Sequence, residues 1–289
     1  MGKVGMALRR DRGHSATVEP AWCAGAVLIG EYFHEIGMDA QNIPLGRDLV
    51  VAHSSDLHVD HDHTARLHGG DGTAGLACVL GAARRAGADV AILAGDTFDS
   101  HRVPQSLTDR AADVIAAAEL PVVILPGNHD PAVAEAVYHR GKLAKVANLH
   151  VLGITHDEAV LFPGLGLEIW GRAHRDYSDM NPLERSRPRV TRWQIAVAHG
   201  HYQPAPDRST RLRPSWLIGD DEIAATGADY VALGHWNRAA KVSGAPCAYY
   251  SGSPEYAGTI NLVRFVPSGE VLVSQLALDI AREPSDFAD

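Results

Sequence analysis

The sequence holds too little cysteine to build a disulfide framework. Its cysteines, Cys23, Cys78 and Cys247, are odd in number and far apart, and none belongs to a C-x-x-C pair. Small secreted domains rely on paired cysteines, whereas a chain of 289 residues can bury a sizeable core. We therefore expect a reducing, cytoplasmic setting, with no disulfide framework and no C-x-x-C metal site.

Long apolar runs are missing as well. No stretch reaches the roughly 18 apolar residues that a bilayer-spanning helix needs. The apolar segment 21–33 is interrupted by Glu31, and no clean cleavage site follows it. These absences predict a protein that neither crosses a membrane nor carries a signal peptide.

Positive charge is scarce over the whole chain but locally abundant. The net charge of −9, from 26 basic and 35 acidic residues, argues against a dedicated nucleic-acid binder, which needs a basic surface. Residues 172–213 nevertheless hold nine arginines against four acidic residues. Two interpretations stay open: a surface approached by a phosphate-rich substrate or nucleic acid, or a solvated loop.

Several catalytic motifs are absent. The sequence contains no G-x-S-x-G nucleophile elbow, no G-x-x-x-x-G-K-[ST] phosphate loop and no G-x-G-x-x-G after a strand. These absences argue against serine hydrolases of the α/β type, P-loop nucleotide hydrolases and dinucleotide-dependent enzymes.

What the chain does contain, from residue 48 onward, is an alternation of β-branched runs and alanine-rich helical stretches. Asp71 and Gly87 are the expected N-cap and C-terminal stop of the first helix. Continuous apolar strands between helices predict a sheet covered on both faces. The expected strands are 48–55, 88–96 and 121–130, and the expected helices are 71–87 and 106–120.

The second half has more strands and fewer helices. We expect strands at 148–153, 165–173, 193–201 and 228–236, and a closing antiparallel set at 247–253, 259–266 and 270–278. The predicted fold is an α/β class, four-layer α/β/β/α sandwich of two mixed sheets over residues 47–282. Residues 1–46 are expected to form a peripheral, poorly ordered extension, and 283–289 an acidic tail.

Five of the predicted strands end in polar side chains that suit a metal ion. Ligands of open α/β sheets gather at the carboxyl ends of the strands, so the five strand ends are expected to converge on one crevice. Mixed carboxylate, imidazole and amide groups suit manganese, iron or zinc. The residues after the five strands are Asp56 and His58; Asp96 and Asp99; Asn128, His129 and Asp130; His199 and His201; and His235 and Asn237.

These motifs resemble those of the calcineurin-like metallophosphoesterases. The resemblance rests on SDLH (55–58), GDTFD (95–99), GNHD (127–130), the strand end at His199 and GH (234–235), and it covers about 48–255. GDTFD and YSGSPEY (250–256) further resemble the DNA-repair exonuclease branch, the Mre11/SbcD-like proteins. The resemblance implies hydrolysis of phosphate mono- or diesters by a bridging hydroxide between two metal ions, manganese foremost, with iron or zinc as alternatives.

The resemblance also implies a role for each motif residue. His129 would neutralise the transition state or protonate the leaving oxygen, and the Asp99 carboxylate would orient it. Asp130 is expected to hold its turn. The first metal would be held by Asp56, His58 and Asp96, with Asp96 bridging to a second metal that Asn128, His199 and His235 complete.

The sequence departs from the family at Asn237, where the usual G-H-x-H pattern has a second histidine. We expect Asn237 to ligate the first metal weakly through its amide oxygen. Three consequences are open: a weaker or harder metal such as manganese, a partly filled position, or a substitute ligand, for which His201 is a candidate.

Other residues near the motifs receive simpler interpretations. His61, His63 and His68 are expected in an exposed loop, with a place at the entrance of the site as the alternative. Trp236 is expected to pack, and stacking on a base is the alternative. The expected partner is a phosphate ester, with a nucleotide or nucleic acid as a further option, and the sequence predicts no oligomeric state. Because the chain ends soon after the core, a stand-alone phosphoesterase is favoured; a DNA exo- or endonuclease and a non-catalytic scaffold with a decayed site are the alternatives.

Overall fold

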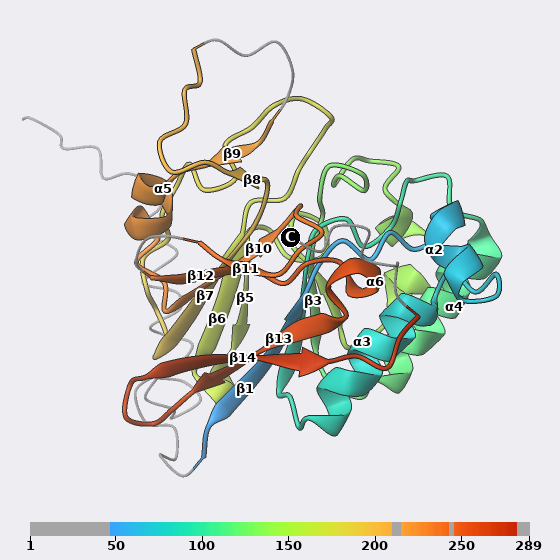
Figure 1. The fold of residues 1–289 in the computed structure, drawn as a ribbon, viewed down its shortest axis with the longest axis horizontal. Coiled ribbons are helices and arrows are strands. Elements are labelled where there is room, and N and C mark those ends of the chain that lie inside the picture. The colour runs from blue at the N-terminus through green and yellow to red at the C-terminus, as the bar shows by residue number, and fades with distance from the viewer. Residues whose placement is uncertain (1–46, 210–214, 243–245, 282–289) are drawn as a thin grey trace, which may run out of the picture. The chain divides into compact units, whose positions relative to one another are not determined.

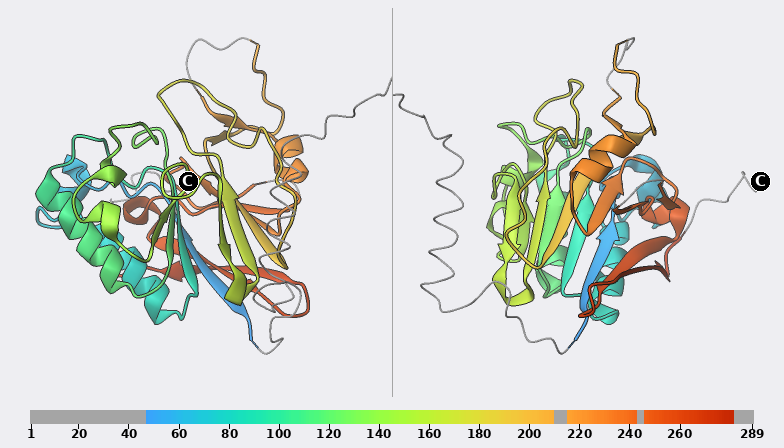
Figure 2. Two further views of the ribbon diagram at one scale, coloured as in Figure 1. Left: turned by 180° about the vertical axis from the view of Figure 1, so that it is seen from behind. Right: turned by 90° about the vertical axis from the view of Figure 1, so that its left-hand side faces the viewer.

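A computed structural model describes residues 47–209, 215–242 and 246–281 of the chain. Two six-stranded sheets lie face to face, and both combine parallel and antiparallel strands (Figures 1 and 2). The prediction of two stacked mixed sheets is therefore confirmed. The predicted extension at 1–46 and the predicted tail at 283–289 lie outside the described residues.

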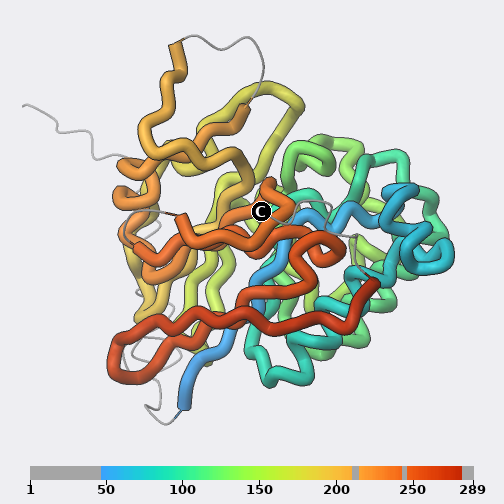
Figure 3. The backbone as a smooth tube through the Cα atoms, viewed as in Figure 1, coloured from blue at the N-terminus to red at the C-terminus, as the bar shows by residue number. Residues whose placement is uncertain are grey.

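The first sheet has the strand order β14-β13-β1-β2-β3-β4. Strands β1 to β4 run parallel, and β13, from near the end of the chain, joins the blue β1 antiparallel (Figure 3). The strands are β1 (Leu49–Ser54), β2 (Val90–Ala94), β3 (Val122–Leu125), β4 (Leu149–Val151), β13 (Thr259–Phe265) and β14 (Val271–Ala277).

The second sheet has the order β11-β12-β10-β7-β6-β5. Its four central strands are parallel, and β5 and β11 form antiparallel edges. A separate two-stranded pair joins β8 (His201–Tyr202) to β9 (Leu217–Ile218). The strands of the large sheet are β5 (Ala159–Phe162), β6 (Leu167–Gly171), β7 (Trp193–His199), β10 (Tyr230–Gly234), β11 (Ala240–Lys241) and β12 (Cys247–Tyr250).

Helices α3 (Ala74–Arg85) and α4 (Gln105–Ala117) cover the outer face of the first sheet. In α3, Leu76, Val79, Leu80 and Ala83 are buried, a spacing that gives one apolar stripe on a helix. A second apolar layer, including Ile92, Val123 and Ile195, fills the space between the two sheets. This packing brings the carboxyl ends of the parallel strands of both sheets to one edge.

The outer face of the second sheet has little helix. Ile223 of the short helix α5 (Asp220–Ala225), Ile218 of β9 and Leu183 of a long connection pack on it. The remaining helices are α2 (Asp62–Leu67), α6 (Pro254–Ala257) and the 3₁₀ turns Val137–His139, Leu143–Lys145 and Pro163–Leu165. Among the described residues, no helix has the length and apolar character needed to span a membrane.

Two local predictions were wrong. Helix α3 has Thr73 as its N-cap, and Asp71 instead accepts hydrogen bonds from the Thr73 amide (2.9 Å) and hydroxyl (2.7 Å) in the preceding turn. The predicted closing antiparallel set is also divided: β12 runs parallel to β10 in the second sheet, whereas β13 and β14 belong to the first. Strand periodicity shows which faces are buried but does not select the partner strand. Gly87 follows the helix with a φ of 68°, as its predicted role as a stop requires.

Candidate metal centre

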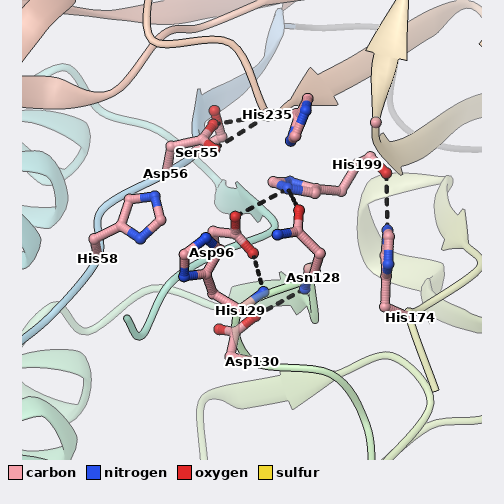
Figure 4. Close-up of polar contacts among 12 residues, drawn as sticks. Ser55, Asp56, His58, Asp96, Asn128, His129, Asp130, His174, His199 and His235 are labelled. Carbon is pink, nitrogen blue, oxygen red and sulfur yellow. Dashed lines mark hydrogen bonds and ion pairs between the residues drawn. The ribbon is translucent and has the colours of Figure 1, made fainter. Parts of the chain in front are cut away.

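The five predicted strand ends meet at one edge of the two sheets. Two groups of side chains there have ligand atoms within 4.8 Å of one another: His58, Asp96 and His129, and Asp96, His199 and His235. Asp96 belongs to both groups. The first sheet contributes the residues after β1, β2 and β3, and the second sheet contributes those at the ends of β7 and β10 (Figure 4).

His199 is the most firmly held of these side chains. Its Nδ1–H donates to the Ala94 carbonyl at 2.9 Å, so that Nε2 faces Asp96 Oδ2 at 3.1 Å and Asn128 Oδ1 at 3.0 Å. The His235 ring lies 5.3 Å from the His199 ring, centre to centre. The imidazole of His199, the carboxylate of Asp96 and the amide of Asn128 are thus close together.

A hollow that we call the Asn237 hollow lies beside Asp56 and His58. Its lining includes Asp56, His58, His61, His63, Asn237 and Glu255. Asn237 therefore lies beside Asp56 and His58, where the motif pattern predicts the residue that closes the first metal's shell. His201, the predicted substitute, instead accepts a hydrogen bond at 3.0 Å from the Nε1–H of Trp236. Trp236 itself stacks on Tyr250, with ring centres 4.3 Å apart, so its predicted packing role is confirmed.

Burial gives the acidic residues of the centre perturbed pKa values. Desolvation raises the pKa of Asp56, and the nearby charge of Asp96 adds to the rise. Desolvation acts on Asp96 too, but the adjacent His199 outweighs it and holds the pKa of Asp96 below its ordinary value. Both carboxylates are nearly fully buried, at 3% and 2% exposure. Two buried carboxylates in one site are an arrangement that a divalent cation stabilises.

The pKa values of His199 and His235 shift in opposite directions. Burial lowers the pKa of His199, but the charge of Asp96 and its hydrogen bond raise it to about 10. Burial and the neighbouring charge of His199 lower the pKa of His235 to about 3. His235 is therefore a neutral imidazole, the form that binds metal, whereas His199 would release a proton when a metal binds. The residues present fit a divalent metal centre.

Four of the predicted ligands have a strained backbone. The φ angles of Asp56, His58, Asp96 and His235 are 55°, 44°, 50° and 107°. Positive φ costs a non-glycine residue about 1–3 kcal/mol, and such strain concentrates at functional sites. Main-chain hydrogen bonds from Asp56 N to Gly95 O and from His58 N to Asp96 O, both 3.0 Å, hold two of these conformations in place.

Two motif glycines make room for the ligands. A Cβ atom on Gly95 would lie 2.0 Å from Nδ1 of His199, and one on Gly127 would lie 2.2 Å from Oδ1 of Asp96. Any side chain at either position would push a predicted ligand aside. The Gly-Asp and Gly-Asn pairs of the motifs therefore have a steric reason in this fold.

His129 lies on the open side of the centre, with 44% of its side chain exposed. Its Nδ1–H donates to the main-chain carbonyl of Asp99 at 3.1 Å, whereas the Asp99 carboxylate is 3.7 Å away. That carboxylate lies closer to His58, at 3.2 Å from Nδ1. Asp99 thus lies beside His129 as predicted, but its main-chain carbonyl is closer to His129 than its carboxylate is.

Asp130 lies behind His129 and is fully buried. Its carboxylate accepts hydrogen bonds from the amides of Gly127 (2.8 Å) and Phe98 (3.0 Å) and from the hydroxyl of Tyr138 (2.5 Å). These contacts join the turn after β3 to the turn after β2. They agree with the expectation that Asp130 holds the turn.

The prediction of an exposed loop for the histidines after the first motif holds for His61, which is exposed, but not for His63, which lies in a helix, or for His68, which is half-buried. Residues 62–67 form α2, and His61 and His63 line the Asn237 hollow. His68 lies 3.4 Å from the carboxylate of Glu255, which is 1% exposed. Three histidines within a few residues of the first ligand pair were the available signal, but only tertiary packing brings Glu255 to them.

The arginines of 172–213 mostly bind within the fold. Arg172, Arg187 and Arg189 form ion pairs with Glu184, Glu168 and Asp229. Arg175 and Arg208 form ion pairs with Asp157 and Glu222, and Arg192 donates to the Pro267 carbonyl. Arg211 and Arg213 lie outside the described residues. These contacts argue against the first of the two predicted interpretations, a surface approached by a phosphate-rich substrate or nucleic acid.

Comparison with known proteins gives one family. The sequence profile of the calcineurin-like phosphoesterases matches residues 49–238. Protein TT1561 of Thermus thermophilus has a similar crystal structure, with a TM-score of 0.50 and 13% identity, covering 79% of this chain and 99% of that one. A second crystal structure gives a TM-score of 0.52 at 13% identity, covering 80% and 100%. At such identity the two structures share the fold alone, and no curated protein matches the chain.

Proposed function

The chain belongs to the calcineurin-like phosphoesterases, metal-binding hydrolases of phosphoric ester bonds, and on that basis we propose that it is a two-metal phosphodiesterase. The observation that carries the proposal is the position of Asp96, which is common to both groups of ligand-capable side chains. A carboxylate shared in this way can bridge two ions. When bound, the metal pair would supply a nucleophile from water at neutral pH and offset charge on the phosphate.

Each metal position has its own set of residues. Asp56, His58, Asp96 and Asn237 would hold the first ion, and Asp96, Asn128, His199 and His235 would hold the second. The contact of His199 with the Ala94 carbonyl supports its role, because that hydrogen bond fixes the tautomer whose Nε2 faces Asp96. Manganese is our first choice for the metal, with iron or zinc as alternatives.

His129 is the proposed catalytic acid. Its Nδ1–H is donated to the Asp99 carbonyl, so Nε2 is the atom left for a substrate oxygen. A protonated Nε2 would donate to the phosphate or to the leaving oxygen as the ester bond breaks. Asp99, which lies beside both His129 and His58, would help to orient the two imidazoles.

Two hollows on either side of His129 favour a diester over a monoester. The Asn237 hollow lies on one side. A second one, the Tyr177 hollow, has a volume of about 510 Å³ and is lined by residues that include Arg102, Asn128, His129, Tyr177 and Trp216. A phosphodiester has two organic groups on its phosphorus, and each hollow offers space for one.

The second hollow also favours an aromatic substituent. Tyr177 is 61% exposed, although exposed aromatic side chains are few among the described residues. Tyr177 and Trp216 share the hollow with the cationic Arg102. Nucleobases stack on such side chains with about 1–3 kcal/mol each. We therefore favour small nucleotide diesters as substrates.

A DNA exo- or endonuclease of the Mre11/SbcD-like branch is the second candidate. The YSGSPEY segment favours it, and in this structure the Ser251 hydroxyl of that segment lies 2.9 Å from the hydroxyl of Ser55, next to the first ligand. The arginine contacts within the fold and the net charge of −9 weigh against a DNA surface.

Metal analysis combined with hydrolysis assays tests the proposal. We expect manganese-dependent cleavage of bis-p-nitrophenyl phosphate that is faster than cleavage of p-nitrophenyl phosphate and of labelled DNA. Faster turnover of the monoester would overturn the diesterase assignment. Cleavage of DNA ends that weakens steeply with salt would favour the nuclease, whereas absence of both bound metal and activity would favour a non-catalytic scaffold.

A further inference from the structure

Asn237 gives the first metal position a weaker ligand than the usual imidazole, yet the hollow around it holds other ligand-capable side chains. His61, His63 and Glu255 line the same hollow as Asp56 and His58. None of the three has a role in the proposed mechanism. Of these, Glu255 combines negative charge with almost complete burial.

Glu255 is 1% exposed, and its Oε2 atom has no hydrogen-bond partner among the described residues. The other oxygen, Oε1, lies 3.4 Å from Nε2 of His68 and near the start of α3, where a Cβ on Gly75 would meet it at 2.6 Å. His68 and the start of α3 are thus the neighbours of Oε1. An unpartnered buried carboxylate oxygen is unfavourable unless a cation or a hydrogen-bond donor binds it.

Hydrogen bonds of the residues just before Glu255 place it relative to the first metal position. The Ser253 amide donates to the Asn237 carbonyl at 3.2 Å, and the Ser251 hydroxyl is bonded to Ser55, the neighbour of Asp56. Glu255 follows two residues later in α6, which contacts α3. The segment that contains Glu255 is therefore tied to both Asn237 and the end of β1.

We propose that Glu255 is the carboxylate partner of the first metal ion in this chain, compensating for the imidazole that position 237 lacks, and that His68 positions it. The inference rests on the two-metal site of the proposed function. With Glu255 as a ligand, the two metal positions differ chemically. The first has Asp56, Asp96, Asn237 and Glu255 with the single imidazole of His58, whereas the second has two imidazoles, His199 and His235.

This difference predicts a preference for different metals. Oxygen ligands suit manganese and magnesium, and imidazoles suit zinc and iron. Compared with the second position, the first would therefore have a smaller preference for zinc over manganese. Asparagine at position 237 would then change the metal preference of the first position, and the position would still bind a metal ion.

Titration of the metal-free full chain with Mn²⁺, followed by the EPR signal of the free ion, tests the role of Glu255 without an activity assay. We expect two sites in the wild type, and in Glu255→Gln a loss of affinity of about 10- to 100-fold at one site alone. Adding Asn237→His to Glu255→Gln should restore that site, because the imidazole returns. Glu119→Gln, an exposed carboxylate paired with Arg84, is the matched control.

The other outcomes distinguish this inference from its premise. Two unchanged sites in Glu255→Gln, or a lost site that Asn237→His fails to restore, would overturn the role of Glu255. Loss of the same site in His61→Ala, with Glu255→Gln unaffected, would assign the compensation to His61 instead. A wild-type chain that binds fewer than two Mn²⁺ ions would overturn the proposed two-metal function itself.

Discussion

Nε2 of His199 lies 3.1 Å from Oδ2 of Asp96, and both side chains are buried. His199 ends β7 in the second sheet, and Asp96 follows β2 in the first. This contact therefore joins the two sheets at the centre of the candidate metal site. Site geometry and the docking of the sheets depend on the same pair.

The shared position of Asp96 predicts a large effect of Asp96→Asn on metal binding. Loss of the bridging charge should weaken Mn²⁺ binding at both positions by at least the roughly 100-fold upper range seen for lost outer-shell partners. Metal content after gel filtration and Mn²⁺ titration measure this. Asp113→Asn, at an exposed carboxylate that pairs with Lys142 at 2.8 Å, is the control and should bind metal normally. Full metal content in Asp96→Asn would exclude a bridging role.

The contacts of His129 predict unequal effects for the two residues assigned to catalysis. His129→Ala should lower kcat by about 10²–10⁴-fold, the usual range for a lost acid, while both metal positions stay filled. Asp99→Asn should cost less, about 10- to 100-fold, the range typical of a lost outer-shell partner, because the main-chain carbonyl that binds His129 remains and only the carboxylate contact with His58 is lost. Steady-state kinetics with bis-p-nitrophenyl phosphate and metal analysis separate the two variants. Equal losses would mean that the Asp99 carboxylate, not its carbonyl, holds His129.

The Tyr177 hollow predicts discrimination between substrates with the same leaving group. Tyr177→Ala should raise KM for thymidine 5′-p-nitrophenyl phosphate by roughly 5- to 100-fold, the loss of one stacking contact. It should leave KM for methyl p-nitrophenyl phosphate unchanged. Leu272→Ala, which also truncates an exposed apolar side chain, is the control. Parallel changes for both esters would show that Tyr177 does not contact the nucleoside.

The buried His53 predicts a pH-dependent stability that is independent of the metal site. Burial lowers the pKa of His53 from 6.5 to about 3, and the Tyr230 hydroxyl donates to its Nδ1 at 2.9 Å. Because the unfolded chain takes up a proton below 6.5 and the folded chain does not, stability is full above pH 6.5 and falls as the pH drops toward 3. The expected slope from this group is about 1.4 kcal/mol per pH unit.

His53→Asn isolates that contribution, because it keeps an acceptor for Tyr230 and removes the titrating group. Urea unfolding of the metal-free chain at several pH values should give the variant a shallower dependence than the wild type. Its stability at neutral pH should fall by about 1–2 kcal/mol, from the altered packing and hydrogen bond. An identical pH slope in the two chains would exclude His53 as its source.

The residues around the Asn237 hollow show which parts of the site could be predicted from the sequence and which could not. The ligand types after each strand, including Asp56 and His235, were predicted because the strands and the short motifs that follow them are local patterns. Glu255 was missed because it is more than a hundred residues from most of its neighbours in the hollow. The partner strand of β12 was mispredicted for a related reason: a run of alternating residues does not specify which sheet it joins.

By itself the sequence determined the order of strands and helices and the side chains at the strand ends, since periodicity and turn residues act within a few positions of the chain. The tertiary structure decided which of those side chains meet. It paired five arginines of 172–213 with acidic residues of the fold, turned the carbonyl of Asp99 toward His129, and buried Glu255 beside Asn237. Such contacts depend on the docking of two sheets, and the free energy of that docking comes from apolar layers that carry no information about the polar edge.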